Sequence, residues 1–133
     1  MATAQKEIEM ILTRQLASYL AFPVFVVDPE GSLVYYNEPA EHILGRRFEE
    51  TDELPAQAWG TLFNPTDDAG APLPVEALPL LIALHEQRPT QRSFWIRGLD
   101  EVARHIDVVA FPLLGQNNRF VGAVALFWEV KHP

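Results

Sequence analysis

Four histidines and eighteen acidic residues are the first candidates for chemistry in this chain of 133 residues, which contains no cysteine. No two of the histidines share the i, i+4 spacing that places two zinc ligands on one face of a helix; they are His42, His85, His105 and His132. The absence of cysteine also excludes thiol nucleophiles, thiolate zinc sites and iron–sulfur clusters. We therefore predict no metal site.

Asp107 is the acidic residue with the most unusual neighbours, because Ile106 and Val108 flank it in a strand-like segment. Strand alternation leaves two interpretations open: a side chain that faces solvent, or an acid held in the apolar interior. In the second case Asp107 or His105 would be the acid–base residue of a small cone-shaped α+β enzyme with an apolar cavity. The chain has no Gly-x-Ser-x-Gly elbow and no glycine-rich phosphate loop. We keep the enzyme as an alternative and predict no catalytic residue.

The charge balance excludes two classes of partner. Ten lysines and arginines against eighteen acidic residues give a net charge of −8 at pH 7, which repels phosphate backbones and anionic membrane surfaces. Glu7 and Glu9 interrupt the region where a signal peptide needs an apolar run, and no stretch approaches the roughly 18 apolar residues of a membrane span. We predict a cytoplasmic domain that binds neither nucleic acid nor membrane.

An amphipathic helix is predicted for residues 3–20, ahead of Pro23, which ends it. Its apolar side chains recur at steps of three and four, which places them along one stripe of the helix. We assign residues 1–21 to this element, which would serve as a dimerisation helix or as a cover for a sheet. The stripe, which we predict to form a homodimer interface, consists of Ile8, Ile11, Leu12, Leu16 and Tyr19.

A β-hairpin and a capped helix follow. Residues 24–27 and 33–36 are apolar strands, and an Asp-Pro-Glu-Gly segment with turn chemistry joins them. An asparagine then stands where a helix N-cap belongs, and a glycine seven residues after the first helical position provides the left-handed stop. The residues that we predict to be structural are Asp28, Gly31, Asn37 and Gly45.

The rest of the chain predicts short helices and then three strands. Residues 46–77 favour one or two short helices joined by turns, and residues 79–84 form a compact apolar helix. Residues 92–97, 105–114 and 120–130 are rich in β-branched and aromatic side chains, and turn residues separate them. The chain is therefore predicted to be an α+β domain with a five-stranded antiparallel sheet.

The last predicted strand is apolar on both of its sides. One set of side chains, Val121, Ala123, Ala125 and Phe127, alternates with Gly122, Val124, Leu126 and Trp128. Alternation does not decide which set faces inward, but it requires that both faces of the sheet be covered. The N-terminal helix and a second subunit are the two available covers. We predict a homodimer that uses the helix stripe together with residues of the outer sheet face.

Three segments of the chain resemble the PAS sensor domain. The hairpin FPVFVVDPEGSLVYYN (residues 22–37) and the helix EPAEHILG after it resemble the start of such a domain. The stretches GAPLPVEALPLLIAL (residues 70–84) and RHIDVVAFPLLGQNNRFVGAVALFWEV (residues 104–130) resemble later parts of PAS modules in bacterial signalling proteins. This resemblance assigns residues 22–131 to a PAS core, in which short helices lie on one face of the sheet.

The resemblance implies a sensory or interaction module of a bacterial signal transduction system. Such a module senses a small molecule or a partner and signals to a partner protein or effector domain through rearrangement of a dimer or a helix. The resemblance also implies a ligand pocket between the inner sheet face and the short helices. A PAS-like dimerisation domain with a filled core and no ligand is a further alternative. Candidate pocket residues are Val27, Tyr35, Trp59, Leu81, Trp95 and Phe127.

The resemblance also bears on cofactors. PAS members that bind flavin covalently attach it to a cysteine, and cysteinyl photochromophores are attached in the same way. A chain without cysteine can therefore carry neither a covalent flavin nor a cysteinyl chromophore. Haem-binding members use a histidine on the helix before the third strand. His85 falls near that helix, but at its polar end beside Glu86, so we do not expect haem. No cofactor is assigned.

Overall fold

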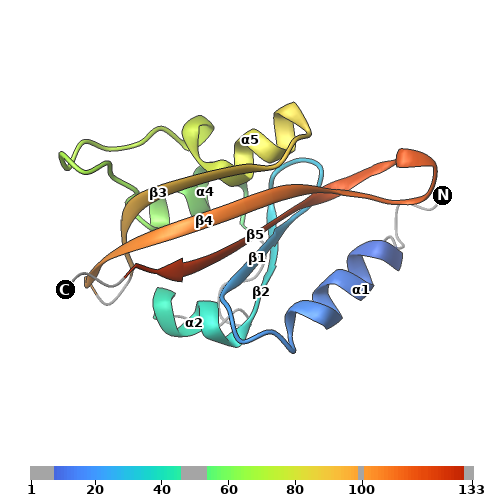
Figure 1. Ribbon diagram of the computed structural model, residues 1–133, viewed down its shortest axis with the longest axis horizontal. Helices are drawn as coiled ribbons and strands as arrows, with labels where there is room; N and C mark the ends of the chain where they lie inside the picture. Colours follow the sequence, from blue (N-terminus) through green and yellow to red (C-terminus); the bar gives the residue numbers. More distant parts are fainter. Residues whose placement is uncertain (1–7, 46–53, 99–100, 131–133) are drawn as a thin grey trace.

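The computed structural model describes residues 8–45, 54–98 and 101–130. Figure 1 shows an α+β domain, which confirms the predicted fold class. Its elements are α1 (Ile8–Ala17), β1 (Val24–Val27), β2 (Leu33–Tyr36), α2 (Glu38–Leu44), α4 (Ala56–Leu62), the 3₁₀ helix η2 (Val75–Ala77), α5 (Pro79–Glu86), β3 (Thr90–Arg97), β4 (Ala103–Leu114), the 3₁₀ turn η3 (Gln116–Asn118) and β5 (Phe120–Glu129).

The five strands form one antiparallel sheet in the order β2-β1-β5-β4-β3. The N-terminal hairpin therefore lies beside the last strand of the chain, and Phe25 faces Ala125 across that junction. Gly122 lies in the same junction with a φ of 141°, and a Cβ there would collide with the carbonyl oxygen of Val27. Only glycine allows β1 and β5 to approach this closely.

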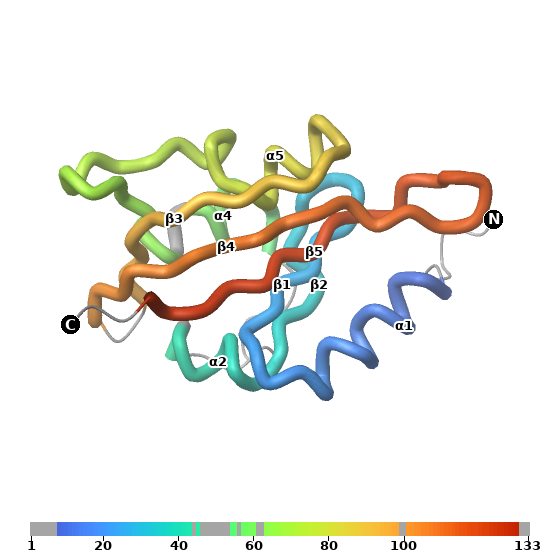
Figure 2. Tube along the Cα trace, viewed as in Figure 1, coloured from blue at the N-terminus to red at the C-terminus, as the bar shows by residue number. Residues whose placement is uncertain are grey.

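Helices lie on both faces of the sheet (Figure 2). On the inner face, α4, η2 and α5 cover a core that contains Phe25, Trp59 and Phe127. On the outer face, α1 (blue) covers a smaller cluster that contains Met10, Val26 and other residues of β1, β2 and β5. The strands β1, β2 and β5 therefore separate two apolar layers. Within the described ranges, no helix is long and apolar enough to cross a membrane.

The hairpin between β1 and β2 is held by its turn. One carboxylate oxygen of Asp28 accepts hydrogen bonds from the backbone N–H groups of Glu30 and Ser32, at 2.9 and 3.0 Å. Gly31 adopts a φ of 89°, which is the left-handed region that glycine enters without strain. The carbonyl oxygen of Gly31 also accepts a hydrogen bond from the indole N–H of Trp59 at 2.9 Å. The turn thus joins the sheet to the helices on its inner face.

Asn37 is buried and connects three elements. Its side-chain oxygen accepts hydrogen bonds from the backbone N–H of Ala40, which caps α2, and from the N–H of Val24 in β1. Its amide nitrogen donates to the carbonyl oxygens of Ala17 and Phe22, both at 2.9 Å. The other end of α2 closes at Gly45, with a φ of 79°. Asn37 therefore fixes the C-terminal end of α1 as well as the start of α2.

The face that α1 turns toward the sheet is not the predicted apolar stripe. Met10 and Ala17 are buried against the outer sheet face, and Thr13 and Arg14 are half-buried on the same side. Polar contacts set this rotation, because Asn37 holds the Ala17 carbonyl at one end of the helix. The predicted stripe is exposed to solvent along its whole length. Residues 1–7, included in the predicted helix, lie outside the described residues.

Candidate functional site

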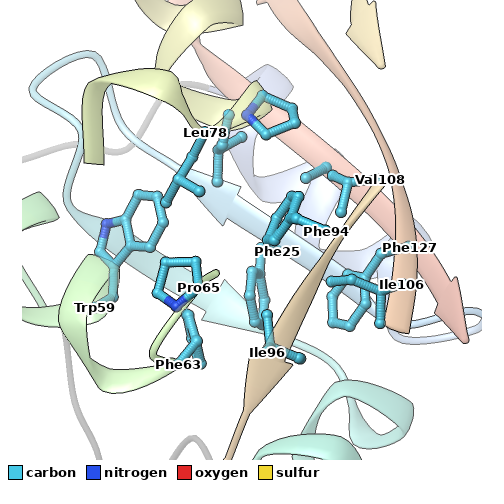
Figure 3. Close-up of a pocket in the computed structure, with 13 residues that line it drawn as sticks. Phe25, Trp59, Phe63, Pro65, Leu78, Phe94, Ile96, Ile106, Val108 and Phe127 are labelled. Carbon is cyan, nitrogen blue, oxygen red and sulfur yellow. The ribbon is translucent and has the colours of Figure 1, made fainter. Parts of the chain in front are cut away.

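A small apolar cavity lies between the inner face of the sheet and the helices α4 and α5 (Figure 3). Its volume is about 40 Å³. Every described residue that lines it is buried. The lining consists of Phe25, Trp59, Phe63, Pro65, Leu78, Pro79, Leu80, Phe94, Ile96, Ile106, Val108, Ala125 and Phe127.

Aromatic rings form much of the cavity wall. Phe25 lies at the centre of this group: its ring stacks on Phe63 with the centroids 5.2 Å apart, and the ring of Phe127 lies 5.1 Å away. The ring of Tyr36 meets that of Phe25 edge-on at 5.7 Å. Trp59 extends the group, with its ring 6.3 Å from that of Phe63. Such packing orients the rings rigidly and leaves polarisable surfaces around the cavity.

The polar atoms nearest the cavity already have partners. The indole N–H of Trp59 donates to Gly31, as described above. The carbonyl oxygen of Phe63 accepts the N–H of Arg97 at 2.7 Å, and that of Pro65 accepts the N–H of Leu73 at 2.9 Å. Among the described residues, no buried side-chain nitrogen or oxygen atom lacks a hydrogen-bond partner. The cavity therefore presents hydrocarbon surface and no available donor or acceptor from its side chains.

The six predicted pocket residues fall into three groups. Trp59 and Phe127 line the cavity. Val27 and Leu81 are buried in the same inner core without reaching the cavity wall. Tyr35 lies on the opposite face, where the guanidinium of Arg14 sits 5.1 Å from the centre of its ring.

Trp95 is also misplaced by the sequence prediction. It lies on the outer face of β3, and its ring stacks against that of His105 with 4.8 Å between the centroids. Tyr35 and Trp95 share one cause of error, because in a strand the side chains alternate between faces and the sequence does not fix the inward parity. Their neighbours Tyr36, Phe94 and Ile96 point inward in their place. Shifting the assumed parity by one residue would have identified Phe94 and Ile96, which line the cavity, and Tyr36, which is buried in the same core without reaching the cavity wall.

The enzyme alternative required His105 or Asp107 in the apolar cavity, and the structure places both on the outer face. Asp107 is half-buried and accepts a hydrogen bond from the Ser93 hydroxyl across the β3–β4 pair. The Nε2 atom of His105 lies 3.9 Å from a carboxylate oxygen of Asp68, which also accepts the indole N–H of Trp95. An acid–base residue inside the cavity is therefore not available from this pair.

The other histidines do not gather either. His85 is exposed at the end of α5, whose buried side chains point toward the sheet, so it cannot reach the cavity. His42 is exposed on α2. In the part of the chain that the structure describes, no group of three or more histidine, aspartate and glutamate side chains could hold a metal ion. His132 lies outside the described residues.

The second functional feature is the exposed face of α1. Tyr19 is 77% exposed, and Ile8, Ile11, Leu12 and Leu16 are 47–65% exposed. The patch continues beyond the helix, where the exposed rings of Phe22 and Trp128 meet edge-on at 6.1 Å. We call these seven residues, Ile8, Ile11, Leu12, Leu16, Tyr19, Phe22 and Trp128, the outer apolar patch. A monomeric protein seldom leaves so many large apolar side chains on one surface without a binding role.

The architecture of this chain is that of one class of small domain: a five-stranded antiparallel sheet with short helices enclosing a cavity on its inner face. No family model matches the sequence, and no curated protein matches it. Solved structures do match. The PAS domain of a protein from Colwellia psychrerythraea aligns over 93% of this chain and 98% of its own, with a TM-score of 0.63 and 16% identity.

Two further structures agree. The PAS domain of nitrogen regulation protein NR(II) from Vibrio parahaemolyticus covers 90% of this chain and 98% of its own, at a TM-score of 0.63 and 16% identity. The LOV protein of Rhodobacter sphaeroides covers 94% of this chain and 69% of its own, at a TM-score of 0.70 and 14% identity. The chain therefore has the PAS fold, as its sequence predicted.

Proposed function

We propose that this chain is a PAS sensory module that forms a homodimer through the outer apolar patch and takes its input at the inner cavity. One observation carries the proposal. The helix α1 covers the outer sheet face with Met10 and Ala17 and presents a second, apolar face to solvent. A helix that served only as a cover would need no such second face.

The size of the patch favours a second copy of the chain as its occupant. A stable interface buries about 800 Å² on each partner, and the ten described residues of α1 span only about 15 Å. These ten residues alone offer too little surface, but Phe111 and Leu126 on the outer sheet face beside them are half-buried. Together with Phe22 and Trp128 they extend the apolar surface from α1 over the sheet. A symmetric pair could place the α1 of each copy over this surface of the other.

The cavity and the patch are separated by one layer of strands. Phe25 of β1 lines the cavity, and its neighbours Val24 and Val26 belong to the outer cluster beneath α1. In β5, Ala125 lines the cavity and Val124 faces outward. A guest that moved Phe25 would move the backbone on which α1 rests. It would change the dimer only through different affinities for two arrangements of the helix.

The dimer is tested by native mass spectrometry and sedimentation of the purified chain. The wild type is expected to be a dimer. Replacing Leu12 and Leu16 by lysine (Leu12→Lys with Leu16→Lys) should give a folded monomer, because both side chains are exposed and a buried pair of ammonium groups is costly. Gln57→Lys adds one ammonium group at an exposed polar position of α4, on the other side of the sheet, and should leave the dimer intact.

A wild type that stays monomeric at high concentration would overturn the proposed dimer. A dimer that survives the double lysine variant would move the interface away from α1. Native mass spectra of protein purified from its source also report any retained small molecule. If the protein is a dimer but no small molecule bound in the cavity changes the position of α1, the chain is the ligand-free dimerisation domain and not a sensor. A cytoplasmic location and an effector partner stay predictions.

A further inference from the structure

The inner cavity is too small for the large heterocycles that a protein pocket often holds. Pockets for ligands of drug size measure about 300–1,000 Å³, whereas this cavity measures about 40 Å³. One water molecule needs roughly 10–15 Å³ of such space, so the cavity holds about three or four particles of that size. A flavin or a haem would require the inner core to open and repack.

The chemistry of the lining is as restrictive as the volume. All thirteen lining residues are apolar or aromatic, and the only side-chain polar atom among them, the Trp59 indole nitrogen, donates to Gly31. Pro65 and Pro79 have no backbone N–H to offer. A polar guest would lose its hydrogen bonds to water and gain none from the side chains of the lining, which opposes its binding.

Water itself is a poor occupant of this space. Buried waters in proteins make about three hydrogen bonds with polar groups, and the cavity side chains have none to give. Apolar cavities of this kind stay dry and accept xenon or small hydrocarbons, because such guests regain dispersion contacts along walls that otherwise face a void. The five aromatic rings of the lining, with their polarisable faces, increase that gain.

We infer that the cavity binds an uncharged, apolar molecule of only a few heavy atoms, such as a dissolved apolar gas or a short hydrocarbon. This inference rests on the proposed function only in treating the cavity as the input site. The class of ligand follows from the volume, the lining and the satisfied polar atoms.

Xenon is the probe that tests the inference, since it has no polar groups and its size is fixed. The methyl groups of Ile96, Ile106 and Leu80 in the cavity wall are followed by NMR as xenon pressure rises. Their chemical shifts should change along a saturable curve. The methyl groups of Val24 and Val26, which face the outer cluster, should show only the small linear drift of non-specific contact.

Filling the cavity provides the matched comparison. Ala125→Val adds two methyl groups at the cavity wall and should weaken xenon binding at least tenfold. Val108→Ile adds one at a second wall position, should weaken it several-fold, and serves if the first variant does not fold. Val124→Ile adds one methyl group to the same strand as Ala125, but on the outer face, and should leave xenon binding unchanged.

Two results would overturn the inference. One is a wild type without saturable shifts, or with shifts that persist in both filled variants. The other is flavin mononucleotide binding that displaces xenon, since it would show that the cavity opens for a large polar ligand. Neither result touches the dimer, which sedimentation measures separately. If the protein proves monomeric but binds xenon along a saturable curve, the inferred class of ligand is supported and the proposed signalling through a dimer is refuted.

Discussion

The two faces of the sheet are covered in different ways. On the inner face, α4, η2 and α5 form a broad layer, and the residues beneath it, such as Phe25 and Trp59, are almost wholly buried. On the outer face a single ten-residue helix, α1, covers part of the sheet and leaves Phe111 and Leu126 half-buried. The inner layer is closed by apolar contact, whereas α1 is held at both ends by polar groups.

Because of this difference, we expect the inner face to determine the stability of the folded domain and the outer face to determine its association into a dimer. Apolar burial is the main favourable contribution to folding and is greatest where the side chains are fully enclosed, so the inner face should dominate the free energy of unfolding. Hydrogen bonds contribute less each, but they are directional. The groups that anchor α1 should therefore determine its position more than the stability of the whole domain.

The largest effect is expected from a truncation in the inner core. Phe25→Ala removes the ring that contacts Phe63, Phe127 and Tyr36 and should lower the free energy of unfolding by about 3–5 kcal/mol, since it adds a void to the lost burial. Leu12→Ala, an apolar truncation on the exposed face of α1, should change it by less than about 0.5 kcal/mol in the monomer. Urea unfolding at low protein concentration measures both.

Equal losses of stability in Phe25→Ala and Leu12→Ala, measured on the monomer, would contradict the proposed difference between the two faces. Repeating the measurement at higher protein concentration adds the contribution of the dimer. The apparent stability of the wild type should then increase and that of Leu12→Ala should increase less, because only association links Leu12 to folding. A concentration-independent loss in Leu12→Ala would place this side chain inside the folded unit.

The features that the sequence predicted well are those that neighbouring residues determine. The hairpin, the turn at Asp28 and the cap at Asn37 each depend on signals within a few positions. The strand segments of the C-terminal meander were also predicted, because β-branched and aromatic runs alternate there with turn residues. The five-stranded antiparallel sheet and the resemblance to the PAS fold followed from this order.

The features that the sequence did not determine depend on contacts between distant residues. The inward parity of β2 and β3 is set by pairing with β1 and β4, so Tyr36 and Phe94 face the core where Tyr35 and Trp95 were predicted. The rotation of α1 is set by Asn37, which lies twenty residues beyond Ala17. The local pattern in the helix selects the exposed stripe, because this is the more apolar side, whereas the sheet-facing side includes Thr13 and Arg14.

A smaller but still large effect is expected at Asn37, the polar residue that joins the outer cover to the sheet. Asn37→Ala removes the α2 cap, takes the side-chain donor from the part-buried carbonyl oxygen of Phe22, and leaves that of Ala17 with only the N–H of Leu20. The expected loss is about 2–4 kcal/mol in the free energy of unfolding. Hydrogen exchange should also show α1 opening well before the inner core does.

Asn37→Asp divides the two roles of this side chain. The carboxylate keeps an acceptor for the N–H groups of Val24 and Ala40 but cannot donate to Ala17 or Phe22 while it is ionised. Amide exchange should therefore accelerate in α1 and stay slow in α2. Equal acceleration in both helices would contradict the view that Asn37 anchors α1 independently of the α2 cap.

The smallest effect is expected at the other end of α1, where Glu9 contacts the β4–β5 hairpin. Its carboxylate accepts the N–H of Gln116 at 3.2 Å and lies 3.4 Å from a guanidinium nitrogen of Arg119, in a half-exposed position. Glu9→Gln should cost only about 0.2–1 kcal/mol, and less at high salt, because solvent screens such pairs. Exchange in the first turn of α1 should nevertheless rise, since this contact fixes the helix locally.

Glu41→Gln is the matched control, because it makes the same change in the first turn of α2, away from the hairpin. It should leave exchange in α1 unchanged. If Glu9→Gln destabilised the domain as much as Phe25→Ala, the outer cover would be part of the stabilising core and the two faces would not differ in kind. A local effect on α1 with little global loss would instead mean that the helix can change position without unfolding the sheet, which is what a signal passed through the dimer requires.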